Sequence, residues 1–405
     1  MTTRPGYRAV LALPGVGALL LAATLARLAG RMFLVALVLY ALGRFGSPQL
    51  AGWAGFLALI PGMIASPLAG ALLDRMGAGR MILLDLACSA LWLASLAAID
   101  AQAMMTPALL LILAALYALT TPLSSAGIRA LLPRLVPHAA RDPVNALDTT
   151  INAVVDTAGP VLSGPLYGFL GAPACFGIIA TLCGLATLAA LPVLRRDIPG
   201  TARGRLFDTA LHGLRHVLAH PTLRGIALSY GMQTVSWGML LVIVPVAVAR
   251  AIGPGPAADS LTGALWAAAG TAGISGALLA GRLRIMGREG SVIALGGLVT
   301  AIALFPIAAI GGLYGLLAGL LLLNFVAGPV AVAVLTLRQR RTDPALLGRV
   351  MAVSISLNIC GQPLGAALAG AVVVGSVEAA LALAAAASLL SALLARRLLR
   401  EVTIG

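Results

Sequence analysis

Charged side chains are scarce in this sequence. Only 10% of its 405 residues are charged, whereas a typical soluble domain carries about 25%. Hydrophobic residues make up 60% of the chain, and its mean hydropathy is +1.03. This composition excludes a water-soluble globule and predicts a multi-pass membrane protein whose solvent is largely the lipid bilayer.

Lysine is absent, so the formal net charge of +14 comes entirely from 27 arginines. These arginines stand in short stretches between apolar runs and do not form one basic cluster. Membrane topology explains such a distribution better than nucleic-acid binding does. We therefore expect no nucleic-acid partner.

The sequence also lacks the patterns of metal, redox and nucleotide chemistry. Its four cysteines all lie inside apolar runs without metal-ligand or disulfide spacing, so they are expected to be small buried hydrophobes. No P-loop is present, and no polar stretch is long enough for a soluble catalytic domain. We expect no metal, no cofactor and no enzymatic activity.

Apolar windows of ~20 residues recur along the chain, and each can cross a ~30 Å hydrocarbon core at ~1.5 Å per residue. We therefore predict an all-α membrane protein with twelve transmembrane helices. The predicted spans lie near residues 17–43, 48–73, 81–100, 107–128, 145–169, 172–194, 223–249, 259–281, 291–311, 313–336, 350–374 and 378–395.

The arginines indicate the orientation of these spans. With twelve spans, 23 arginines fall in loops on one side, and only Arg44 and Arg250 fall on the other. The remaining two, Arg27 and Arg31, lie inside the first apolar run. Because arginine-rich loops stay in the cytoplasm, we expect both termini on the cytoplasmic side of a bacterial inner membrane.

The longest polar interruption divides the spans into two sets of six. We predict an N-terminal six-helix bundle over residues 1–194 and a C-terminal six-helix bundle over residues 222–405. Residues 195–221 would form a cytoplasmic linker with an amphipathic helix lying on the membrane surface.

Short repeats support this division. The tetrapeptide at residues 70–73 recurs at 276–279, and Asp-Pro at residues 142–143 recurs at 343–344, with offsets of 206 and 201 residues. Two related halves are typical of alternating-access transporters, which bind their substrate between the halves near the bilayer midplane.

The loop after the second span combines glycines, one carboxylate and two arginines, namely Gly70, Asp74, Arg75, Gly77 and Arg80. This pattern resembles the signature loop of the major facilitator superfamily. The resemblance implies two pseudo-symmetric bundles and a loop that gates the cytoplasmic side.

Two departures from the family pattern limit the role of this loop. Residues 78–79 are Ala-Gly, where the family often has two basic residues, and the second-half copy has Ala280 where an acid would stand. Asp74 can accept hydrogen bonds from a helix N-terminus and pair with Arg75 or Arg80, acting as a latch. The alternative is a solvated charge in a tight turn.

Three further stretches are similar to the branch of the superfamily that contains siderophore exporters, including enterobactin exporters, and macrolide efflux pumps. They are residues 145–147, 213–224 and 347–352. The resemblance implies export. Gly159-Pro160 is similar to the antiporter motif of drug–proton exchangers and joins the gating candidates, although Val155 and Ser163 stand where that motif usually has glycine.

Two arginines in the first span are candidates for substrate binding. Arg27 and Arg31 are four residues apart and share one helix face. Arginine inside a membrane is costly and by default marks a functional site or a paired charge. The face would attract an anionic substrate group such as a carboxylate or catecholate, unless the helix starts late and places Arg27 near the membrane surface.

Three aspartates are candidates for proton coupling. Asp156 lies about three turns into the fifth span and one turn before Gly159, while Asp148 and Asp85 are shallower. A lone buried carboxylate tends to be neutral, whereas pairing with Arg27 or Arg31 keeps it ionised. A purely structural ion pair is the alternative.

Neutral polar residues deep in the second-half spans are further candidates for substrate contact, although most such residues only hydrogen-bond neighbouring helices. They are Gln233, Trp237, Asn324, Asn358 and Gln362.

Together these features predict a secondary active exporter of a small amphipathic metabolite, with a siderophore as the favoured substrate class and proton antiport as the favoured coupling. Its partners would be the substrate, protons and the bilayer, and it would act as a monomer. A multidrug or macrolide efflux pump, an uptake permease, and an integral membrane enzyme or lipid-handling scaffold remain alternatives.

Overall fold

The computed structural model describes residues 7–137, 140–194, 214–280, 287–342, 353–354 and 357–399. Much of the predicted linker, the Asp-Pro pair at 343–344, residues 347–352 and Arg282 lie outside the described residues. The described part is almost entirely helical, and ten of its helices are long and apolar enough to cross a membrane.

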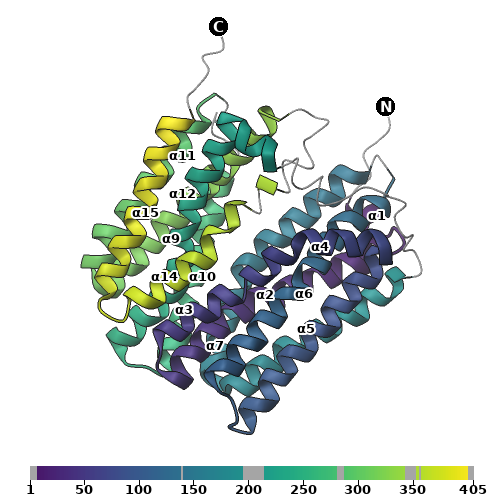
Figure 1. The fold of residues 1–405 in the computed structure, drawn as a ribbon, viewed down its shortest axis with the longest axis horizontal. Helices are drawn as coiled ribbons and strands as arrows, with labels where there is room; N and C mark the ends of the chain where they lie inside the picture. The colour runs from purple at the N-terminus through teal and green to yellow at the C-terminus, as the bar shows by residue number, and fades with distance from the viewer. Residues whose placement is uncertain are drawn as a thin grey trace. The chain divides into compact units, whose positions relative to one another are not determined.

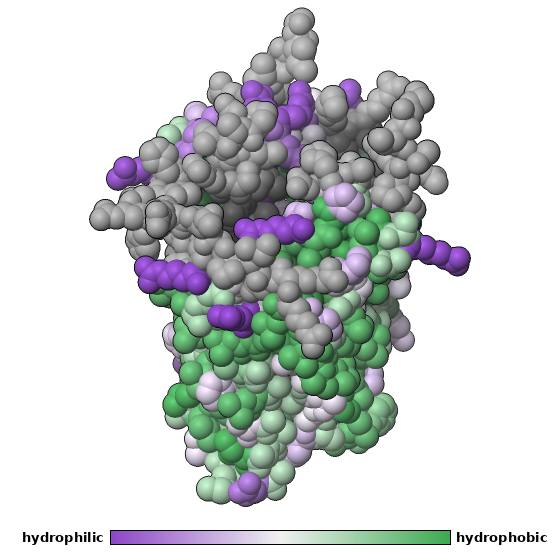
Figure 2. Space-filling model, turned by 90° about the vertical axis from the view of Figure 1, so that its right-hand side faces the viewer, coloured by the Kyte–Doolittle hydropathy of each residue, from purple (hydrophilic) through white to green (hydrophobic). Residues whose placement is uncertain are grey.

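The contacts group the chain into two compact units. The first consists of Met1–Ala36 and Leu57–Leu206, and the second of Leu37–Phe56 and Phe207–Gly405. The predicted boundaries at residues 194 and 222 stay a prediction. On the face drawn in Figure 2, apolar side chains form a broad band and hydrophilic side chains gather mainly toward one end, as expected for a protein that contacts lipid.

The first half of the chain forms the helices α1 (Tyr7–Leu11), α2 (Val16–Phe45), α3 (Pro48–Leu57), α4 (Ile60–Met76), α5 (Ala78–Ala101), α6 (Pro107–Leu131), η1 (Leu132–Arg134) and α7 (Arg141–Leu194). Within the first unit, α5 packs against α6 and α7, and α4 packs against α6 (Figure 1).

Local sequence explains where these helices begin and end. Thr106 caps α6 by accepting a hydrogen bond from the Leu109 N–H at 3.3 Å. Gly77 ends α4 with φ 89°, a backbone conformation that disfavours side-chain-bearing residues, and so allows the turn into α5. The predicted span 48–73 is divided into α3 and α4 because Pro61 has no N–H with which to continue the helix from Leu57.

Helix α7 contains two predicted spans. Its backbone leaves helical geometry at Gly171, with φ 77°, inside the short gap predicted between spans 145–169 and 172–194. A 54-residue helix would be far longer than one span, so the break at Gly171 separates two membrane crossings.

The second half forms α9 (Pro221–Ile252), α10 (Pro256–Ala280), α11 (Glu289–Ile302), η3 (Ala303–Ala308), α12 (Gly312–Arg340), α14 (Gly361–Val372) and α15 (Val377–Leu398). Helix α9 packs against α10, α14 and α15, and α12 packs against α10 and α11. With α7 counted as two crossings and the shorter apolar helix ending at Val372 included, each of the twelve predicted spans has a helical counterpart.

An ion pair joins two helix ends in the second unit. Arg340, at the end of α12, donates from Nη1 to Oε1 of Glu289 at 2.7 Å. The Glu289 side chain is only 4% exposed, whereas Arg340 is 36% exposed. The positive end of the α11 helix dipole also stabilises a carboxylate in the first turn of that helix. The second half therefore has its own buried acid, fixed by Arg340.

Candidate functional site

A cavity of about 230 Å³ lies within the first unit. Its wall combines charged, hydroxyl and aromatic groups from α2, α5, α6 and α7, together with apolar residues. The polar and aromatic members are Arg27, Arg31, Phe33, Asp85, Ser89, Tyr117, Thr121, Ser124, Ser125, Asn152 and Asp156. Such a mixture can contact both the polar and the apolar parts of an amphipathic molecule.

The first charged pair on this wall joins Arg31 and Asp156. Arg31 donates from Nε to Oδ1 of Asp156 at 2.7 Å, and both side chains remain about half exposed, at 48% and 51%. An arginine has five N–H donors, and the others make no hydrogen bond with residues in the described ranges. Arg31 can therefore be positioned by Asp156 and still present donors to the cavity.

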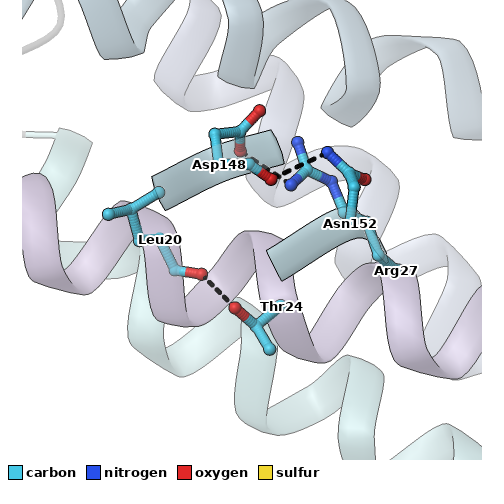
Figure 3. Close-up of polar contacts among 5 residues, drawn as sticks. All are labelled: Leu20, Thr24, Arg27, Asp148 and Asn152. Atoms are coloured by element: carbon cyan, nitrogen blue, oxygen red, sulfur yellow. Dashed lines mark hydrogen bonds and ion pairs between the residues drawn. The ribbon is translucent and has the colours of Figure 1, made fainter. Parts of the chain in front are cut away.

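The second charged pair joins Arg27 and Asp148. Figure 3 shows the Arg27 guanidinium directed at the Asp148 carboxylate, and Nη1 lies 2.7 Å from Oδ1. Both side chains are less than 20% exposed. One turn along α7, the Asn152 side chain donates to the Asp148 carbonyl oxygen at 3.0 Å. This pair is the more enclosed of the two.

Helix spacing explains why both pairs form together. Arg27 and Arg31 stand four residues apart on α2, and Asp148 and Asp156 stand eight residues apart on α7, so each pair of like charges shares one helix face. Helix α2 begins at Val16, which places Arg27 about 17 Å along the helix at ~1.5 Å per residue. The depth of Arg27 in the membrane stays a prediction.

Gly159 allows α7 to lie close to Arg31. A methyl group built on Gly159 would overlap the Cβ of Arg31, so only glycine fits at this crossing. Four residues later, the buried hydroxyl of Ser163 donates to the Met32 carbonyl oxygen at 2.9 Å. Gly159 and Pro160, predicted as gating residues, thus lie on α7 beside the Arg31–Asp156 pair, and their gating role stays a prediction.

Asp85 lies in a different environment from the other two candidate aspartates. It is 2% exposed, and it accepts hydrogen bonds from Ser89 Oγ at 3.2 Å and from the Ser124 backbone N–H at 3.3 Å. Within the described part of the chain it has no arginine partner. Asp85 is therefore a carboxyl group that hydroxyl and amide groups contact within the described residues.

The aromatic part of the wall consists of Phe33 and Tyr117, with Phe176 behind Phe33. The rings of Phe33 and Tyr117 have centroids 4.4 Å apart, and Phe176 lies edge-on to Phe33 at 6.4 Å. Such a cluster offers apolar and π surface beside the charged pairs.

Sequence reasoning missed much of this wall. The missed polar residues are Ser89, Tyr117, Thr121, Ser124, Ser125 and Asn152. A signal was available in the run Thr-Thr-Pro-Leu-Ser-Ser at residues 120–125, which places four hydroxyls around a proline in the middle of an apolar span. Ser89, one turn after Asp85, was a second signal.

The structure describes part of the predicted gating loop. The side chain of Asp74 and the surroundings of Gly70 lie outside what it describes. Arg75, in the last turn of α4, and Arg80, in the first turn of α5, are both exposed, and the Gly77 N–H donates to the Leu73 carbonyl oxygen at 3.0 Å. The latch role of this loop stays a prediction.

Two of the five neutral candidates in the second unit share a small cavity. Gln233 and Trp237 line a space of about 20 Å³ together with Tyr230 and Thr300. The Gln233 side-chain oxygen is buried without a hydrogen-bond partner in the described ranges. A space of this size holds about one water molecule, and substrate contact by Gln233 and Trp237 stays a prediction.

The other three neutral candidates contact their own helix or a neighbouring helix. The Asn324 amide donates to the Leu320 carbonyl oxygen at 2.9 Å. Asn358 is 4% exposed, and with its amide oriented to suit its neighbours, its oxygen accepts from Arg338 Nη2 at 2.6 Å. The backbone of Gln362 packs against Gly238 of α9, where a methyl group would overlap its carbonyl oxygen. Substrate contact by these three stays a prediction.

Comparison with known proteins agrees with this architecture. Residues 19–232 match the family model described as Major Facilitator Superfamily. An uncharacterized MFS-type transporter, y4rN, from Sinorhizobium fredii is 47% identical over 97% of this chain and 97% of its own length. The enterobactin exporter EntS of Salmonella typhi is 28% identical over 61% of this chain and 59% of its own length.

Solved structures resemble this fold at low sequence identity. A crystal structure of the nucleoside transporter NupG superposes with a TM-score of 0.76 at 12% identity, covering 95% of this chain and 99% of that one. A POT family transporter in complex with a thioalcohol-conjugated peptide gives a TM-score of 0.72 at 10% identity, covering 94% of each chain. The match to the family model and the near full-length relative show that the chain is a multi-pass membrane transporter of the Major Facilitator Superfamily.

Proposed function

We propose that this transporter is a secondary active exporter that moves a small amphipathic anion, with a siderophore as the favoured class, out of the bacterial cytoplasm in exchange for protons. The observation that carries the proposal is the Arg31–Asp156 pair, which is half exposed to a cavity with an aromatic side. The partial likeness to EntS supports the choice of substrate class.

The geometry suggests how Arg31 recognises its substrate. Asp156 holds the guanidinium through Nε, so the terminal NH₂ groups can bind a carboxylate or catecholate of the substrate. Phe33 and Tyr117 offer an apolar surface to the rest of the molecule. Arg27, held by Asp148, adds positive charge on the same face of α2.

The same pair offers a route to proton antiport. Protonation of Asp156 removes the negative charge that fixes Arg31, so only a hydrogen bond to a neutral oxygen holds the guanidinium and the substrate is bound more weakly. Proton and substrate would then favour different states of one pair, which is the requirement for exchange. Gly159, packed against Arg31, would transmit the change to the crossing of α2 and α7.

In this proposal both termini lie in the cytoplasm and the chain works as a monomer in the inner membrane, without a cofactor or catalytic chemistry. The arginine distribution supports the orientation because 23 of the 27 arginines fall on one side of the predicted spans.

Deleting the gene tests the substrate class directly. If the protein exports a siderophore, deletion makes cells retain an iron chelator in the cytoplasm, and a plasmid-borne copy restores its secretion. If deletion instead makes cells sensitive to macrolides and other drugs with normal chelator secretion, the siderophore assignment is wrong and the multidrug pump replaces it.

A further inference from the structure

Asp85 stands in a ring of oxygen atoms that the proposed export mechanism does not use. Its carboxylate is 3.2 Å from Ser89 Oγ, one turn along α5. Across the helix interface, the hydroxyls of Thr120 and Ser124 on α6 also lie within hydrogen-bonding reach of the carboxylate. The carboxylate and these three hydroxyls therefore bring oxygen atoms from α5 and α6 together, and the Ser124 backbone N–H also donates to the carboxylate at 3.3 Å.

The hydroxyls of Thr120 and Ser124 can donate hydrogen bonds to backbone carbonyl oxygens of α6 itself. Thr120 Oγ1 lies 3.3 Å from the Tyr117 carbonyl oxygen, and Ser124 Oγ lies 3.3 Å from the Thr121 carbonyl oxygen. A hydroxyl has one proton and two lone pairs, so a hydroxyl that donates to the backbone presents only lone pairs elsewhere. The side of α6 that faces Asp85 can thus become a surface of oxygen acceptors.

A carboxyl group buried as deeply as Asp85 is either neutral and protonated or is a carboxylate offset by a cation. Asp85 is 2% exposed, and within the described ranges no arginine or histidine pairs with it. An unpaired charge is costly to bury, and an ionised carboxyl at this depth needs a cation to offset it. The cavity next to Asp85 offers a route of entry, because Asp85, Ser89 and Ser124 all line it.

We propose that Asp85, Ser89, Thr120 and Ser124 form a binding site for a sodium ion. Carboxylate and hydroxyl oxygens are the ligands of hard cations, and a single carboxylate balances a single positive charge. A proton needs only one of these oxygens, whereas a sodium ion uses the whole ring. The site goes beyond the proposed export function, which rests on Arg31 and Asp156.

Equilibrium binding of radiolabelled Na⁺ to the purified full-length chain tests the site without any substrate. Wild-type protein should bind Na⁺ saturably, and unlabelled Na⁺ but not choline should displace the label. Asp85→Asn should abolish saturable binding, because the amide keeps the size of the side chain but removes its charge. Ser89→Ala and Ser124→Ala should each weaken binding several-fold.

Asp100→Asn is the matched control, because it makes the same substitution at the far end of the same helix and away from the cavity. It should bind Na⁺ as wild type does. Size-exclusion profiles and circular dichroism check that each variant folds. If Asp85→Asn does not fold, the loss of Na⁺ affinity in Ser89→Ala and Ser124→Ala decides the test.

The absence of saturable Na⁺ binding in the wild type overturns the proposal, as does full binding in folded Asp85→Asn. A proton-binding Asp85 without Na⁺ binding also overturns it. Each of these results leaves the export proposal standing, because substrate efflux is measured separately.

Discussion

Replacing Arg31 with glutamine tests how the transporter holds the anionic group of its substrate. Glutamine keeps a polar side chain, but it is shorter and lacks the positive charge and the forked donors. A hydrogen bond to a charged group contributes about 1.5–3 kcal/mol. Because the Arg31 side chain is 48% exposed, we take the lower end of that range, which corresponds to roughly tenfold weaker binding of an anionic substrate.

The assay is equilibrium binding to purified protein of two ligands, a catecholate siderophore and a neutral macrolide. Arg31→Gln should weaken binding of the siderophore about tenfold and leave binding of the macrolide nearly unchanged. Arg31→Lys keeps the charge but loses the Nε contact to Asp156, so its effect should be intermediate.

Arg250→Gln is the matched control. Arg250, at the end of α9, donates to the carbonyl oxygens of Val373 and Val374 at 2.7 and 3.0 Å, and it is not part of the cavity wall. This variant should bind both ligands as wild type does. Equal losses for the charged and the neutral ligand in Arg31→Gln would refute charge recognition by Arg31.

Three further predictions concern the pairs and the helix crossing. Asp156→Asn should abolish gradient-driven efflux in vesicles but keep substrate binding, since the Asn side-chain oxygen can still accept from Arg31 Nε; efflux at the wild-type rate would eliminate Asp156 as a coupling group. Gly159→Val should lower the free energy of unfolding by about 1–3 kcal/mol, because the valine side chain would overlap Arg31. A fluorescence melt measures the loss, and an unchanged melting temperature would show that the crossing of α2 and α7 can relax. Glu289→Gln should lower the free energy of unfolding by about 1–3 kcal/mol because the Glu289 side chain is buried. The double variant Glu289→Gln, Arg340→Gln should lose less stability than the sum of the two single variants, and strictly additive losses would show that the pair is not coupled.

The sequence was sufficient to predict the helices. Apolar runs of ~20 residues have few alternatives to a membrane-spanning helix, and every predicted span has a counterpart in the structure. Local chemistry decides the details that hydropathy misses. Pro61 splits the second span into two helices, and Gly171 breaks a helix that would otherwise continue through two spans.

The candidate site was only partly predictable. Spacing placed Arg27 and Arg31 on one helix face, and the sequence left open whether Asp156 is neutral or pairs with one of them. The choice of Arg31 for Asp156, and of Arg27 for Asp148, depends on how α2 and α7 are rotated and shifted against each other. Helix periodicity carries no information about that relation.

The surroundings of Asp85 were not predicted for a related reason. Ser124, whose backbone N–H contacts the carboxylate, is 39 residues away in the sequence and on another helix. The polar run at residues 120–125 was a signal that sequence reasoning missed, and the packing of α5 against α6 is what brings it to Asp85.

Substrate accumulation in inside-out membrane vesicles tests the central claim, proton-driven export through the Arg31–Asp156 pair, most directly. Energised vesicles with the wild-type protein should accumulate a labelled catecholate siderophore, a protonophore should abolish the accumulation, and vesicles with Asp156→Asn should fail to accumulate it although the variant is inserted and binds the siderophore. Accumulation that survives the protonophore, or that is equal in Asp156→Asn and wild type, would contradict the account.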